Sequence, residues 1–215
     1  GPERACAQGW ISPRDMRNGI IVTVLFACLI GSALLFYAGW ELIIVGLLCV
    51  LFAFLYTTGP YPLSYNGWGD VLVIVFFGFV PVGGTYYVQA LTWTSDTTVA
   101  SLICGLLIDT LLVVNNYRDR EADARSGKRT VIVRFGEKFG RYLYLMLGVA
   151  ASLLCFWFFF EGHLFAALLP LLYLIPHVLT WRRMVQIHSG KKLNSILGET
   201  SRNMLLMGIG FLIRH

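Results

Sequence analysis

The chain has 215 residues, of which 57% are hydrophobic and only 13% are charged, and its mean hydropathy is +0.68. This composition excludes an ordinary soluble domain and indicates a protein embedded in lipid. The formal net charge is +5, but the basic residues do not form a stripe with interleaved aromatic residues, so we expect no nucleic-acid partner.

Long uncharged runs predict membrane-spanning helices, because a span needs about 20 apolar residues. Divided at the turn signals, the runs give seven spans, at 18–38, 41–57, 70–92, 97–116, 139–160, 163–181 and 196–214. Pro81, Pro170 and Pro176 within these spans predict kinks, which neighbouring helices make tolerable in a membrane. We therefore expect an all-α, polytopic transmembrane bundle that forms a single domain over 1–215.

The Lys and Arg residues are segregated along the chain. Sixteen of the 17 lie in three stretches, 1–17, 118–141 and 182–202. Because basic loops of membrane proteins stay in the cytoplasm, this asymmetry predicts that 117–138 and 182–195 face the cytoplasm. The breaks at 38–41, 93–96 and 161–162 then lie outside. The predicted location is the bacterial cytoplasmic (inner) membrane.

The segment 115–130, at the end of the fourth predicted span, carries the chemistry. Asn115, Asp119 and Asp123 are spaced i, i+4, i+8, which puts three oxygen-bearing side chains on one helical face. Such a face suits Mg²⁺, which takes one or two carboxylates and bridges to substrate phosphates. Phosphate-seeking cations surround it, namely Arg118, Arg125, Lys128 and Arg129. The alternative is a solvated loop that only sets topology, and the helical register favours the metal site.

Asp109 lies well inside the fourth predicted span. An isolated charge there costs at least about 3 kcal/mol. Asp109 must therefore be paired, protonated or functional.

The run from Asn115 to Asp119, followed by Asp123 and by Gly127 to Thr130, resembles the second aspartate-rich motif of the UbiA superfamily of intramembrane prenyltransferases. It is most similar to the MenA branch, which acts on 1,4-dihydroxy-2-naphthoate. The stretch from Tyr56 to Asp70 is similar to the family's loop after its fourth helix, and 84–89 resembles the following span. Gly1 to Arg4, with Gln8 and Gly9, resembles the stretch just after the first motif.

The resemblance implies nine helices and two facing aspartate-rich motifs. We therefore expect that two helices and the first motif precede this chain, and that the chain alone is inactive. It also implies a Mg²⁺-dependent transfer of a polyprenyl group from polyprenyl diphosphate to 1,4-dihydroxy-2-naphthoate. Loss of the acceptor's carboxyl group leads to demethylmenaquinone, in menaquinone biosynthesis. The apolar spans then supply a groove for the prenyl tail that opens toward the lipid bilayer.

The roles of individual residues follow from the matching positions. Asp119 and Asp123 are the expected Mg²⁺ ligands, and Tyr56 and Asp70 are the expected catalytic residues. The expected substrate-binding residues are Asn115, Asn116, Arg118, Lys128, Tyr61 and Tyr65. The alternative for the tyrosines is an interfacial aromatic belt, and the alternative for Asp70 is a helix N-cap.

One departure from the family concerns the loop between Tyr56 and Asp70. Many relatives carry a Lys or Arg shortly after the position of Tyr56, whereas this chain has none before Asp70. The contacts of this loop with diphosphate or acceptor therefore stay open.

Two other functions stay open. A prenyltransferase of the same superfamily could take another acceptor, such as 4-hydroxybenzoate, haem or a tocopherol precursor. From a different class, the chain could be a transporter of an anionic substrate that uses Asp109 and the basic loops. Mg²⁺-dependent release of diphosphate separates an enzyme from a transporter.

Overall fold

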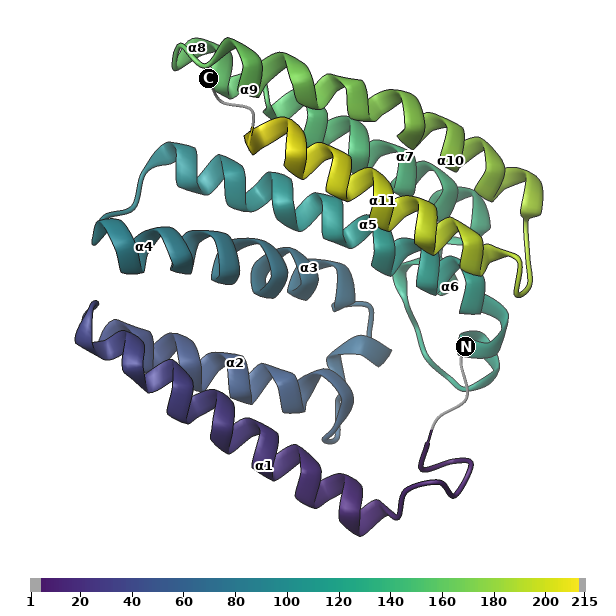
Figure 1. Cartoon of the computed structure of the whole chain (residues 1–215). Coiled ribbons are helices and arrows are strands. Elements are labelled where there is room, and N and C mark those ends of the chain that lie inside the picture. The colour runs from purple at the N-terminus through teal and green to yellow at the C-terminus, as the bar shows by residue number, and fades with distance from the viewer. Residues whose placement is uncertain (1–4, 213–215) are drawn as a thin grey trace.

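The computed structural model describes residues 5–212, which form helices joined by loops and contain no strand (Figure 1). The prediction of an all-α bundle is therefore confirmed for this part of the chain. The opening segment 1–4 and the end of the last predicted span, 213–214, lie outside the described residues.

The elements follow one another along the chain without long interruptions. The first half contains α1 (Pro13–Ser32), η1 (Ala33–Phe36), α2 (Glu41–Thr57), η2 (Leu63–Tyr65), α3 (Gly69–Val73), η3 (Ile74–Gly83) and α4 (Gly84–Ala90). The second half contains α5 (Ser95–Arg125), α6 (Val131–Phe135), α7 (Glu137–Leu154), α8 (Trp157–Phe160), α9 (Leu164–Leu168), η4 (Leu169–Tyr173), α10 (Leu174–Ile187) and α11 (Leu193–Leu212).

Five helical stretches in the described residues are long and apolar enough to cross a membrane. They are Pro13–Phe36, Gly69–Ala90, Ser95–Arg125, Glu137–Phe160 and Leu164–Ile187. The apolar helix α2 is shorter, with 17 residues. Helices occupy all seven predicted places, but a count of seven spans stays a prediction.

Helix α5 is longer than predicted. The predicted span ends at 116, whereas the helix continues for nine more residues to Arg125 and includes the motif on its last turns. The added turns are rich in Arg, Glu and Ala, which favour helix. The helix ends where Gly127 adopts a φ of +75°, a conformation that glycine takes without strain.

Two of the three predicted proline irregularities are present. Pro81 lies inside the π-helical stretch η3, and Pro170 lies in the first turn of the 3₁₀ segment η4. Pro176 is the third residue of α10 and does not interrupt it. A proline is tolerated in a first turn because the N–H groups there have no partner within the helix.

The centre of the bundle is α5, which packs against η3, α7 and α11. Its side facing α7 and α11 contributes Val113, Val114 and Tyr117 to the main apolar core. Its other side meets η3 almost backbone to backbone, since a Cβ on Gly78 would come within 2.5 Å of the Ser101 carbonyl oxygen. Small residues allow such close approach of membrane helices.

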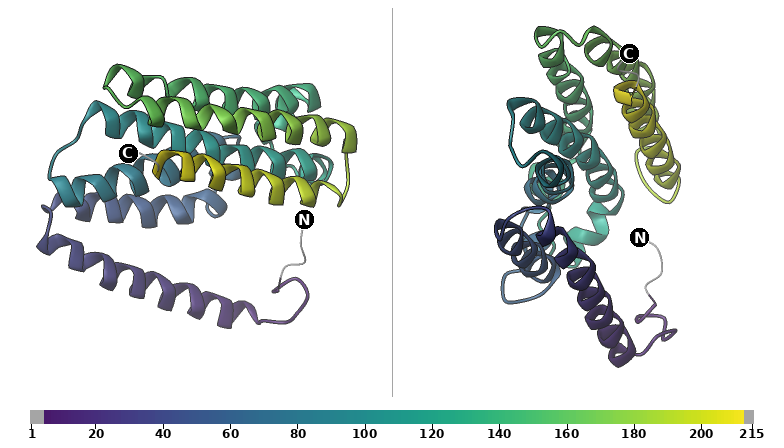
Figure 2. Two further views of the ribbon diagram at one scale, coloured as in Figure 1. Left: turned by 45° about the horizontal axis from the view of Figure 1, so that its top comes forward. Right: turned by 60° about the vertical axis from the view of Figure 1, so that its left-hand side comes forward.

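Helices α1 and α2 form a hairpin at the edge of the bundle, apart from α7 and α10 in both figures (Figures 1 and 2). Neither helix buries a residue. Several of their large apolar side chains, including Phe26, Leu29 and Leu47, are more than half exposed. These helices therefore present an apolar surface suited to lipid or to further membrane helices.

The loops gather at two ends of the bundle (Figure 1). One end holds the connections around η2 and α6 and the turn between α10 and α11, and the basic loops after α5 and α10 lie there. The other end holds the turns after η1, α4 and α8. This separation is the one that the charge pattern predicts, while the side of the membrane stays a prediction.

Candidate functional site

The motif residues lie on the last turns of α5. Because α5 is unbroken through Arg125, the spacing of Asn115, Asp119 and Asp123 places them along one helical face. The Asn115 amide nitrogen donates to the Leu111 carbonyl at 3.1 Å, which fixes the orientation of its side chain. Asn116 is buried, with 5% of its surface exposed.

Each predicted metal ligand is paired with a predicted diphosphate ligand. Arg118 donates two parallel hydrogen bonds to the Asp119 carboxylate, from Nε at 2.8 Å and from Nη2 at 2.7 Å. Lys128 Nζ lies 3.2 Å from Asp123 Oδ2. The two acids and the two cations are thus brought together as the sequence predicts. Arg118 also donates to Asn194 Oδ1 at 2.9 Å, which ties the motif to α11.

Two loops that are far apart in sequence meet beside the motif. The Arg129 backbone N–H donates to the Tyr65 carbonyl at 2.7 Å, and Arg134 Nη2 donates to the Asn66 carbonyl at 2.8 Å. Gly67 makes this contact possible, because its φ is +82° and a Cβ would lie 3.1 Å from the Arg129 carbonyl oxygen. The loop after α2 is therefore fixed to the loop after α5.

The three predicted tyrosines lie in different surroundings. Tyr56 is half-buried at the end of α2, and its carbonyl accepts a hydrogen bond from Ser64 Oγ. Its hydroxyl lies against α3, 3.5 Å from where a Cβ on Gly69 would be. Tyr61 and Tyr65 are 55% and 38% exposed. Only Tyr56 therefore points into the bundle.

Asp70 is not the N-cap of α3. It is the second residue of the helix, the N-cap position is Trp68, and no side chain caps this end. The N-cap alternative is therefore wrong. Asp70 Oδ1 is buried without a hydrogen-bond partner among the described residues, and the same holds for Asp109 Oδ1. Asp109 itself is only 1% exposed.

The sequence reasoning missed an ionic cluster around Glu137, the first residue of α7. Its carboxylate contacts Arg141, Arg120 Nη2 at 3.2 Å, and His188 Nε2 at 3.1 Å. The buried Tyr117 hydroxyl lies 3.3 Å from the same carboxylate, and Arg120 covers the Tyr117 ring. A signal was present, because Glu137 is the sole acid in a strongly basic part of the sequence, 124–160. The cluster joins α5, α7 and the turn after α10.

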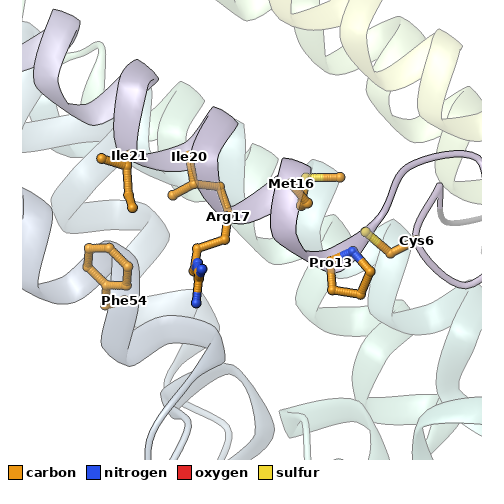
Figure 3. Close-up of a pocket in the computed structure, with 7 residues that line it drawn as sticks. All are labelled: Cys6, Pro13, Met16, Arg17, Ile20, Ile21 and Phe54. Atoms are coloured by element: carbon orange, nitrogen blue, oxygen red, sulfur yellow. The ribbon is translucent and has the colours of Figure 1, made fainter.

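One apolar pocket lies away from the motif. It has a volume of about 530 Å³ and is lined by the segment before α1, by α1 and by Phe54 of α2 (Figure 3). Its walls are apolar except for Arg17, which points from α1 toward α2 in Figure 3. None of the predicted site residues lines it.

The donor set on α5 fits Mg²⁺ in its chemistry. Two carboxylates and an amide oxygen on one face are hard ligands, and Mg²⁺ is commonly held by one or two carboxylates together with waters and substrate phosphates. Within residues 5–212, no group of three or more His, Cys, Asp or Glu side chains is placed to form a closed metal cage. The residues therefore suit an open site that a phosphorylated substrate completes.

Comparisons with known proteins agree with the motif. Residues 1–202 match the UbiA prenyltransferase family. The chain is 38% identical over 161 residues to 1,4-dihydroxy-2-naphthoate octaprenyltransferase of Escherichia coli (strain K12), covering 72% of this chain and 52% of that protein. It is also 38% identical over 186 residues to the protein of that name from Haemophilus influenzae, covering 80% of this chain and 60% of the relative.

A eukaryotic protein is more distantly similar. UbiA prenyltransferase domain-containing protein 1 of Dictyostelium discoideum is 29% identical over 153 residues, which are 71% of this chain and 45% of that protein. No solved structure matches the chain significantly. The chain spans about half the length of these relatives. With nearly its whole length matched, this chain belongs to the UbiA prenyltransferase family.

Proposed function

We propose that the protein transfers a polyprenyl group from polyprenyl diphosphate to 1,4-dihydroxy-2-naphthoate, with loss of the acceptor's carboxyl group, on the route to demethylmenaquinone. The observation that carries this proposal is the two ion pairs at the C-terminal end of α5, Asp119 with Arg118 and Asp123 with Lys128 of the following loop. The acceptor rests on the similarity to relatives that bear the name of this naphthoate prenyltransferase.

The residues of α5 bind the diphosphate in this proposal. Asp119 and Asp123 would hold Mg²⁺ with Asn115 in support, and the bound ion would supply positive charge against the leaving diphosphate. Arg118 and Lys128 are already placed at these carboxylates, 2.7 and 3.2 Å away. They therefore reach the phosphate oxygens without moving far, as charge-assisted donors.

The transfer itself breaks one bond and forms another. The allylic C–O bond opens with its electron pair staying on the diphosphate, and a ring carbon of the acceptor supplies the electron pair of the new C–C bond. Decarboxylation returns an electron pair to the ring. We assign Tyr56, at the end of α2, and Asp70, at the start of α3, to the acceptor. We assign Tyr61 and Tyr65, which are more exposed, to the entrance of the site.

The surroundings of the site follow from the charge pattern. We propose that the motif end faces the cytoplasm of a bacterial inner membrane, because the basic stretches gather there. The apolar surfaces of the spans then meet lipid and guide the prenyl tail. A transporter function is less well supported, because no observation besides the buried Asp109 favours it.

The acceptor is tested by a transfer assay on the full-length protein with polyprenyl diphosphate and Mg²⁺. We expect 1,4-dihydroxy-2-naphthoate to be prenylated in preference to 4-hydroxybenzoate, with release of CO₂ and diphosphate. Turnover of the benzoate alone refutes the acceptor and leaves prenyl transfer intact. Absence of Mg²⁺-dependent diphosphate release with every acceptor refutes the enzyme itself.

A further inference from the structure

Asp109 is the buried acid that the diphosphate site does not use. It lies in the middle of α5 with 1% of its surface exposed, and its Oδ1 has no hydrogen-bond partner among the described residues. A charged or unpaired carboxyl group at this depth is costly, so its retention calls for a function.

The contacts between η3 and α5 identify the residue that faces Asp109. The two helices run in opposite directions (Figure 1). A Cβ on Gly78 would touch the backbone of Ser101, and a Cβ on Gly105 would touch the backbone of Ile74 at 2.9 Å. Moving four residues toward the N-terminus of η3 therefore corresponds to moving four residues toward the C-terminus of α5. Extended by one turn beyond the contact of Ile74 with Gly105, this register places Asp70 opposite Asp109.

Other observations agree with this register. Gly69, next to Asp70, lies against Leu112, the residue three positions after Asp109. Asp70 lies near enough for its charge to act on Asp109, and the Tyr56 hydroxyl lies within electrostatic reach of both acids. Asp70 Oδ1 is also buried without a partner. The seam between the helices thus ends in two facing carboxyl groups with a phenol beside them.

Two carboxylates that face one another in a membrane, with no cation between them, repel strongly. They are compatible when they hold one proton between them. The more deeply buried group is the better place for the proton, because burial disfavours charge. A proton on Asp109 would let it donate a hydrogen bond to Asp70 and would leave the other Asp70 oxygen available to a substrate hydroxyl group.

The depth of the pair suits the acceptor. Asp119 lies ten residues beyond Asp109 along α5, about 15 Å by helical rise. The diphosphate binds at the Asp119 end, and the prenyl tail runs into the apolar bundle, so the reacting allylic carbon lies between the two levels. An aromatic ring placed against that carbon has its hydroxyl groups near the acid pair.

We propose that Asp109 is a positioning residue, which holds Asp70 through a shared proton so that Asp70 accepts a hydrogen bond from a hydroxyl group of the aromatic acceptor. This inference rests on the proposed function, since it deepens the acceptor side of the same site. It differs from a role in helix packing, because the glycine contacts already fix the two helices and an apolar pair would be the better filler.

Two variants of Asp109 in the full-length enzyme separate the roles. Asp109→Asn keeps a donor of the same shape and removes the proton, so the acceptor KM stays within about threefold of the wild type. Asp109→Leu removes the donor, and the acceptor KM rises about 10- to 100-fold, the loss expected for a hydrogen bond that aligns a charged group. The KM for polyprenyl diphosphate stays unchanged in both variants.

A binding assay makes the test independent of turnover. The inhibition or dissociation constants of 1-hydroxy-2-naphthoate and 4-hydroxy-2-naphthoate, each lacking one acceptor hydroxyl, are compared with that of the parent compound. In the wild type, we expect one analogue to bind more weakly than the parent compound. In Asp109→Leu, we expect that analogue and the parent compound to bind equally well. Thermal unfolding, measured beside it, shows that Asp109→Leu is folded.

The results that overturn the inference are distinct from failure of the proposed function. If Asp109→Asn loses as much as Asp109→Leu, the ionised carboxylate is what matters and the shared proton is refuted. If both substrates lose affinity equally, or if only the melting temperature falls, Asp109 is structural. If the wild type prenylates another phenolic acceptor instead, the naphthoate assignment fails. The binding of that acceptor and of its analogue lacking the hydroxyl group is then compared between the wild type and the Asp109 variants.

Discussion

The close contact between η3 and α5 gives a prediction whose size follows from the structure. An added Cβ at Gly78 would lie 2.5 Å from the Ser101 carbonyl oxygen and 2.8 Å from the Gly105 Cα. Carbon atoms in contact normally lie about 3.5–4.0 Å apart. Because the opposing atoms are backbone, no side chain can rotate away. Gly78→Ala therefore forces the helices apart by about 1 Å.

We expect two effects of Gly78→Ala. Overpacking of this kind costs about 1–3 kcal/mol, which lowers the melting temperature of a chain this long by about 2–12 °C. The same shift separates Asp70 from Asp109. Since a misplacement of about 1 Å at a reacting group can cost about 100-fold in rate, we expect kcat/KM for the acceptor to fall by about 10- to 100-fold.

The matched control is Gly84→Ala, in the same predicted span. No atom lies within 4 Å of a Cβ at Gly84, so this variant is neutral or gains up to about 1 kcal/mol from helix propensity. Thermal unfolding in detergent and the transfer assay, run on both variants in the full-length protein, provide the measurements. The reasoning is refuted if Gly78→Ala unfolds and turns over like Gly84→Ala.

The other predictions concern the charged end of the bundle. Asp119→Ala and Asp123→Ala lower kcat by more than about 100-fold without unfolding the protein, and Lys128→Ala has a milder effect. If the two Asp variants keep near wild-type rates at limiting Mg²⁺, the metal assignment is wrong. Glu137→Gln leaves Arg120, Arg141 and His188 facing one another without their acid, so it lowers the free energy of unfolding by about 1–3 kcal/mol. The control variant Glu121→Gln, at an exposed position, does not lower it. Equal melting temperatures of the two variants contradict a stabilising role of the cluster. In a cysteine-free background, single cysteines at 125–129 stay unlabelled by an impermeant thiol reagent on intact cells, and labelling there reverses the topology.

Much of the molecule is predictable from local sequence. Apolar runs of span length give the helices, because in lipid every backbone group must be satisfied within its own segment. The motif spacing gives the common face of Asn115, Asp119 and Asp123, because helical periodicity depends on neighbours a few residues away. The predicted span ended at 116 because the residues that follow are charged, and the helix continues past the span to Arg125, as the spacing of the motif requires.

The sequence by itself therefore determined the membrane class, the approximate helices and the identity of the charged motif. The tertiary structure alone decided the partners across the bundle: Arg118 with Asn194, Arg134 with the Asn66 carbonyl, and Gly78 against Ser101. These residues are separated by 76, 68 and 23 positions, so no local pattern relates them. Their pairing depends on how closely two helix surfaces approach. At the seam of η3 and α5 the helices approach closely because Gly78 and Gly105 have no side chain between the two backbones.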